Sequence, residues 1–80
     1  MCEDSKTNGR IFVLETISGL ERLNVQYEKE LRDAEAGTGL CKGIPENSRK
    51  AIASMLAKHI DDNKKAIQEY LDYMNEIENE

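Results

Sequence analysis

The sequence has few of the residues that build bulky aromatic cores or interrupt helices: no tryptophan, one phenylalanine and one proline among 80 residues. Any core must therefore be made mainly from leucine, isoleucine, valine, methionine and tyrosine. Because Pro45 is the only residue that removes a backbone donor and clashes with a preceding turn, most of the chain is free to form helix. The longest apolar run is Ile11-Phe12-Val13-Leu14, far short of the roughly 20 residues that span a membrane, so no membrane segment is expected.

Cysteine is scarce as well. Cys2 lies near the start of the chain and Cys41 lies in a glycine-rich stretch. Two cysteines without a recognisable signal peptide are typical of free thiols in a reducing compartment. We therefore expect a cytoplasmic protein, in the host cytoplasm if it is viral, and we expect both thiols to be replaceable.

The charge pattern and the single histidine argue against several functional classes. The net charge is −5, with basic residues scattered among acidic ones, whereas direct nucleic-acid binding needs a basic face. His59 has no serine or cysteine motif to act on as a base, and Asp62, one turn away, makes only an isolated pair with it. The sequence thus predicts a protein that is not an enzyme and that carries no metal or other cofactor.

Two series of apolar residues recur at alternating steps of four and three. This spacing is typical of a helix that packs along another helix at a shallow angle. The first series is Val13, Ile17, Leu20, Tyr27, Leu31 and Ala34, and the second is Leu56, Ile60, Ile67, Tyr70, Met74 and Ile77. Gly37 is well placed to end the first helix in a left-handed cap, and Pro45 suits the first turn of the second.

The predicted fold class is all-α, an antiparallel two-helix hairpin. We expect a disordered segment over residues 1–8 and a single domain over residues 9–80. Within that domain, the first helix covers 9–36, a loop covers 37–44 and the second helix covers 45–78. The loop is short, and a short connection places consecutive helices antiparallel.

Each apolar series is interrupted once, by Asn24 in the first and by Asn63 in the second. Such an asparagine either lies at a partly hydrated layer or fixes the register and the number of partners at some cost in stability. The sequence leaves both interpretations open. Gly19, inside the first predicted helix, leaves a similar choice between simple tolerance and a close helix approach or slight bend.

The open end of the hairpin, opposite the loop, is predicted to be an assembly surface. A run of four apolar residues covers all sides of a helix, so one partner helix cannot bury it. At about 25 cal/mol per Å² of apolar area, leaving such groups in water forgoes several kcal/mol. We therefore expect the hairpin to assemble into a dimer or larger helical bundle. The expected interface residues are Ile11, Phe12, Leu14, Leu71, Met74 and Ile77.

Three basic residues, Lys42, Arg49 and Lys50, gather at the start of the second predicted helix. The unpaired backbone N–H groups and the positive end of the helix dipole lie at the same place. Together these groups are suited to holding a phosphate or carboxylate. The simpler interpretation is a set of hydrated basic residues that Glu46 partly neutralises.

The second predicted helix also carries a recognisable order of residues. Ile44-Pro45 is followed by Arg49, then by His59-Ile60-Asp61-Asp62 and by Ala66-Ile67, all after a loop that contains glycine. In this order, mostly over residues 44–71, the chain resembles the small phage-encoded helical hairpins that counter bacterial immunity by sequestering cyclic-nucleotide signals. Asp61-Asp62 and Lys64-Lys65 depart from that pattern, and no binding residue is carried over. The resemblance implies only a class, an oligomeric and non-enzymatic phage-type binder.

These observations favour a self-associating helical hairpin that acts by binding, as a regulator or inhibitor of a partner protein, with an anti-defence role of the phage type. After Lys65 the chain carries no base and several acids, which form either a tail that keeps the protein in solution or an acidic surface suited to a basic partner. The alternative is an oligomeric sponge that sequesters a small anionic ligand, a nucleotide signalling molecule, at the basic residues near the start of the second helix.

Overall fold

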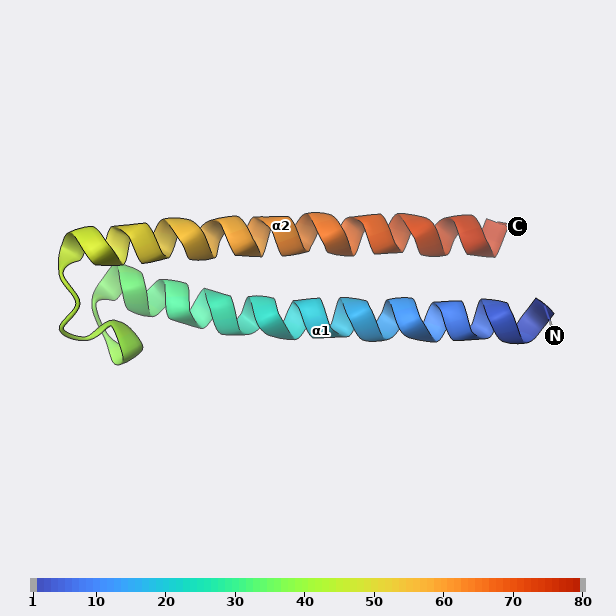
Figure 1. Cartoon of the computed structure of the whole chain (residues 1–80), viewed down its shortest axis with the longest axis horizontal. Helices are drawn as coiled ribbons and strands as arrows, with labels where there is room; N and C mark the ends of the chain where they lie inside the picture. Colours follow the sequence, from blue (N-terminus) through green and yellow to red (C-terminus); the bar gives the residue numbers. More distant parts are fainter. Residues whose placement is uncertain (1, 80) are drawn as a thin grey trace.

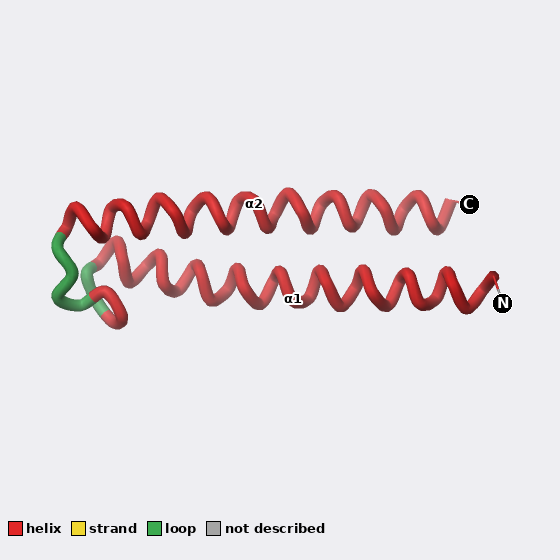
Figure 2. Tube along the Cα trace, in the orientation of Figure 1, coloured by secondary structure: helices red, strands yellow, loops and turns green. Residues whose placement is uncertain are grey.

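Two long helices form the whole architecture. The structure is a computed structural model that describes residues 2–79, with side chains described from residue 8 onward. Helix α1 (Cys2–Ala36) and helix α2 (Glu46–Asn79) are joined by a connection that holds a short 3-10 helix, η1 (Gly39–Cys41). The helices lie side by side and run in opposite directions, so both ends of the chain lie at the end away from the connection (Figure 1). The predicted all-α antiparallel hairpin is confirmed, and Figure 2 shows that the non-helical backbone of the described residues is confined to the connection.

The two apolar series form the contact between the helices. Val13, Ile17 and Ala34 of α1 are buried against α2, whose Leu56 and Ile60 are buried in return. The other members of both series are half-buried. Because two helices have only this one seam to bury, the molecule is long and thin, with extents of 57 by 16 by 12 Å.

The structure corrects the N-terminal boundary of the first helix. α1 begins at Cys2, whereas the sequence predicted disorder over residues 1–8; Met1 lies outside the described residues. No proline interrupts residues 2–8, and an established helix extends easily because each added residue contributes one hydrogen bond without a new nucleation step. As a result α1 runs alongside the end of α2, and Met74 and Ile77, which the sequence placed in the open-end interface, are half-buried.

Gly37 ends α1 as predicted, with a positive φ of 71°. The next residue closes the helix end: the Thr38 N–H donates to the carbonyl of Asp33 at 3.1 Å, the long-range bond of a Schellman cap. α2 begins at Glu46, one residue after Pro45.

Gly19 has no packing requirement within the hairpin. A methyl group added at Gly19 would meet no atom within 4 Å. A close approach of α2 to this glycine, one of the interpretations left open by the sequence, is therefore wrong.

Cys41 in η1 is buried, with 6% of its surface exposed, and its thiol is free. Its backbone N–H donates to the Thr38 carbonyl at 3.0 Å, and its carbonyl accepts from the Ile44 N–H at 3.2 Å. The buried thiol therefore acts as a small apolar group where the connection packs against α1. This burial removes the reason for expecting Cys41 to be replaceable; the side chain of Cys2 lies outside the described residues.

We expect Cys41→Ser to lower the free energy of unfolding by about 1–3 kcal/mol, because it buries a hydroxyl at a position that held a thiol without a side-chain hydrogen bond. Cys41→Ala should cost less, because alanine leaves only a small void. Leu40→Ser is the matched control, since Leu40 is 79% exposed. Urea unfolding at one protein concentration measures all three. Equal midpoints for Cys41→Ser and Leu40→Ser would show that the thiol has no packing role.

Candidate functional site

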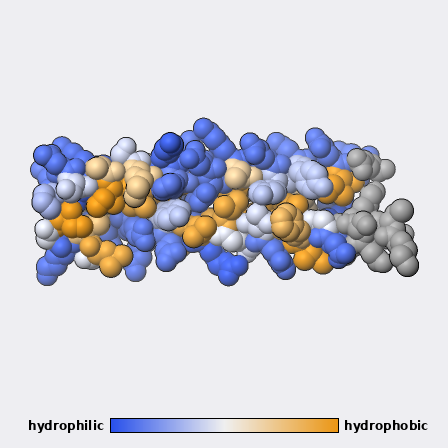
Figure 3. Space-filling model, viewed as in Figure 1, coloured by the Kyte–Doolittle hydropathy of each residue, from blue (hydrophilic) through white to orange (hydrophobic). Residues whose placement is uncertain are grey.

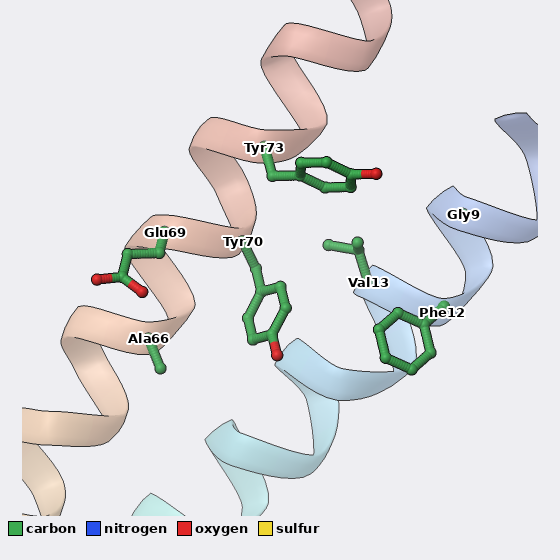
Figure 4. Close-up of a pocket in the computed structure, with 7 residues that line it drawn as sticks. All are labelled: Gly9, Phe12, Val13, Ala66, Glu69, Tyr70 and Tyr73. Atoms are coloured by element: carbon green, nitrogen blue, oxygen red, sulfur yellow. The ribbon is translucent and has the colours of Figure 1, made fainter.

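An apolar groove lies between the helices near the open end of the hairpin. It has a volume of about 500 Å³, and it is lined by Gly9, Phe12, Val13, Ala66, Glu69, Tyr70 and Tyr73. Figure 4 shows the Tyr70 and Tyr73 rings projecting from α2 towards α1, while the Glu69 carboxylate extends away from α1. Phe12 is 63% exposed and Tyr73 is 50% exposed. The groove is thus open, aromatic and only partly filled by its own side chains.

The residues expected at the open-end interface do not share one face. Phe12 lines the groove, and Leu14 does not. The two side chains lie about 200° apart around α1, so they leave the hairpin on opposite faces, and both are exposed. Leu71 is exposed without lining the groove.

Further exposed apolar side chains lie beyond the groove, towards the middle of the hairpin. Leu23 of α1 is eleven residues from Phe12, and Met55 of α2 is eleven residues from Ala66. Eleven residues make about three helical turns, so each pair lies on one side of its helix. Between them the Tyr27 and His59 rings pack at a centroid distance of 5.8 Å. Leu23 and Met55 were not predicted as surface residues; the eleven-residue spacing to Phe12 was the signal that pointed to Leu23.

Asn24 and Asn63 meet each other across the seam. The Asn63 side-chain amide donates to Asn24 Oδ1 at 2.9 Å, and the Asn24 amide donates to the carbonyl of Ile60 at 3.4 Å. Asn24 is buried, with 6% of its surface exposed. The two interruptions of the apolar series therefore meet in a single polar layer.

Arg49 is held by the backbone of the hairpin's closed end. Its Nη1 donates to the Ala34 carbonyl at 3.0 Å and to the Glu35 carbonyl at 3.4 Å, and its Nε donates to the Ile44 carbonyl at 3.1 Å. The last carbonyls of a helix have no partner within it, and a cation near that end is favoured by the helix dipole. Arg49 thus supplies the end of α1 with donors from the other helix.

The other predicted anion contacts are arranged differently. Lys50 is exposed and lies 3.6 Å from Glu46, one turn earlier on α2. Arg49 and Lys50 share a groove of about 260 Å³ with the carboxylate residues Glu35 and Glu46, and Lys42 is not among its lining residues. The structure therefore brings two of the three basic residues together, but it places acids beside them and directs Arg49 to backbone carbonyls.

The side chains that most often carry chemistry have structural contacts here. The His59 ring packs on Tyr27, and the Cys41 thiol is buried. Within the described part of the chain, no three metal-ligating side chains come together, and neither long helix has an apolar stretch sufficient to cross a bilayer.

Comparison of the chain with protein-family models, with curated proteins and with solved structures finds no match in any of the three.

Proposed function

We propose that this protein is a non-enzymatic, self-associating helical hairpin that acts by binding a partner protein, as a regulator or inhibitor. The observation that carries the proposal is the amount of apolar surface left outside a thin molecule. Nine large hydrophobic side chains are exposed on the described residues: Ile11, Phe12, Leu14, Leu23, Val25, Leu40, Met55, Leu71 and Tyr73. Two helices offer no second layer to cover them, and stable domains are built from packed layers.

A role in binding is also consistent with what the reactive side chains do. Cys41 is buried and Arg49 donates to backbone carbonyls, which leaves both little freedom to act on a substrate. The exposed His59 ring packs on Tyr27. The exposed groups that remain are apolar or carry ordinary surface charge. Contact is therefore the activity best supported by the surface.

The acidic end of α2 favours a basic partner. The last turn of α2 holds no basic residue, and Glu69, Asp72, Glu76 and Glu78 are all exposed. Acids near a helix C-terminus are unfavourable for the helix itself, so a basic surface docked there would relieve that cost. Binding of this kind should weaken as salt rises. The sequence resemblance to phage-encoded anti-defence hairpins supports only the class, an oligomeric and non-enzymatic binder.

Nucleotide sequestration, the alternative function, has less support. It needs basic side chains free to hold phosphate, whereas Arg49 donates to three backbone carbonyls and shares its groove with Glu35 and Glu46. A nucleotide bound there would compete with the contacts that close the hairpin.

Native mass spectrometry of the protein purified from cells at low salt tests the proposal. We expect masses at integer multiples of the 9.1 kDa chain, a bound partner protein that is lost at high salt, and no retained nucleotide. A single-chain mass at every concentration tested would overturn self-association. A stoichiometric added mass of a few hundred daltons, released by Lys50→Asp, would instead support the nucleotide sponge.

A further inference from the structure

We propose that one long face of the hairpin is the surface on which a second copy of this chain docks, to form a four-helix assembly. This face, called the tyrosine face below, is marked by Phe12, Leu23, Tyr27, Met55, His59 and Tyr73. The inference rests on the self-association proposed above and names the surface that performs it. It moves the interface away from the tip of the open end and along the length of the molecule.

The tyrosine face is continuous because its residues repeat at helical spacing on both helices of the hairpin. On α1, Phe12, Leu23 and Tyr27 are separated by about three turns and then one turn; on α2, Met55 and His59 are one turn apart. The Tyr27–His59 ring contact joins the two helices at mid-length, and the aromatic groove joins them near the open end. Figure 3 shows one long face on which hydrophobic side chains lie at intervals over both helices rather than only at one end.

The opposite face differs in charge. The contrast is sharpest between the exposed residues Leu23 and Val25, which lie two positions apart on α1 but on opposite faces. The residues three and four positions from Leu23, which neighbour it on the helix surface, are all uncharged: Gly19, Leu20, Gln26 and Tyr27. The corresponding neighbours of Val25 are all charged: Glu21, Arg22, Glu28 and Lys29. The core of a protein interface is depleted of charge. The surface around Leu23 therefore fits the core of an interface, whereas Val25 is surrounded by charged side chains that favour water.

The size of the face matches what a stable dimer needs. The hairpin's extents of 57 by 16 Å outline a rectangle on the order of 900 Å², so one broad side has room for the about 800 Å² that specific interfaces bury on each partner. A second identical face supplies the missing layer over the seam, including an apolar cover for Phe12 and Tyr73.

A second copy fits this face better than a foreign protein. Two-fold dimers bury the same patch on both subunits, so the patch must be compatible with itself. The uncharged surface around Leu23 can meet its own copy without repulsion, while Glu30 and Asp62, three residues from Tyr27 and His59, place acids beside it. A foreign partner selected by charge would instead be drawn to the acidic end of α2, so the two proposed surfaces are separate.

The test compares paired alanine variants in equilibrium sedimentation. The variant Leu23→Ala/Met55→Ala should weaken self-association by at least about tenfold, because it removes two apolar anchors near the centre. The matched control Leu14→Ala/Val25→Ala removes two apolar side chains from the opposite face that are at least as exposed as Leu23 and Met55. It should change the dissociation constant by less than about threefold. Circular dichroism of each variant at high concentration confirms that the hairpin is folded.

Hydroxyl-radical footprinting of the unmodified chain gives a second readout that no folding defect can obscure. Raising the protein concentration should protect Phe12, Leu23, Met55 and Tyr73 from modification and leave Leu14 and Val25 unchanged. If the wild type assembles but Leu14 and Val25 are the protected pair, this face is the wrong one while self-association stands. If the wild type remains a single chain at all concentrations, both proposals fail together.

Discussion

Arg49→Ala is expected to lower the free energy of unfolding by about 2–4 kcal/mol. Hydrogen bonds with one charged partner contribute about 1.5–3 kcal/mol each, and Arg49 makes three to backbone carbonyls, one of them long and exposed. For a chain of this size each kcal/mol corresponds to roughly 4–8 °C in melting temperature. Thermal unfolding at one fixed protein concentration should therefore show a drop of roughly 8–32 °C.

The physical reason lies in how α1 ends. The Thr38 and Gly37 N–H groups both donate to the carbonyl of Asp33, so the following carbonyls of Ala34 and Glu35 receive nothing from the cap. Arg49 fills that gap from α2, and the same guanidinium donates to Ile44 just before α2 begins. One side chain thus binds the end of the first helix, the connection and the start of the second helix.

Two variants separate this role from a role in anion binding. Lys50→Ala, at the next position, removes a lysine whose side chain is 73% exposed beside Glu46. Surface ion pairs of this kind contribute little to stability, so the free energy of unfolding should stay within about 0.5 kcal/mol of wild type. Arg49→Lys keeps the charge but loses the fork of donors, so it should recover only part of the loss. An Arg49→Ala protein of unchanged stability that no longer binds an added nucleotide would identify Arg49 as a ligand contact instead.

The seam of the hairpin was predictable from sequence because it depends on a repeat along each helix. Val13, Ile17, Leu56 and Ile60 fall at the predicted spacing and are buried, and Gly37 ends α1 with the positive φ that only glycine adopts readily. These features depend on residues close together along the chain, so the order of residues in the sequence predicts them. The start of α1 was misjudged because a polar terminal segment with weak intrinsic preference takes its conformation from the helix that it extends.

The remaining features depend on which residues meet across the hairpin, and spacing along one helix does not report that. Arg49 looked like an anion contact because its partners, carbonyls of Ala34 and Glu35, have no sequence signature. Phe12 and Leu14 were grouped because they lie at the same end of the hairpin, although the helix sends them to opposite faces. Asn24 and Asn63 were each recognised as interruptions, but only the register of the two helices shows that they form one pair.

Asn63→Ala is expected to destabilise the hairpin by about 1–3 kcal/mol. It removes the donor to Asn24 Oδ1 and leaves a buried acceptor without its shortest hydrogen bond, and that acceptor then loses its compensation for desolvation. Asn75→Ala is the matched control, because Asn75 is exposed on the same helix and should lose no stability. Urea unfolding measures both variants.

Replacing both partners should have the opposite effect on stability. In Asn24→Leu/Asn63→Leu the seam becomes apolar throughout, and we expect a gain of about 1–2 kcal/mol, since removing both members of a buried polar pair is often neutral or stabilising. The variant should instead lose its single register and its single number of chains, because a buried asparagine fixes both. Wild type should give one set of amide signals by two-dimensional NMR, whereas the double leucine variant should give additional sets or a broader distribution of masses in sedimentation. A double variant that is less stable than wild type and still has one register would show that the pair acts as a net stabiliser rather than as the element that sets the alignment.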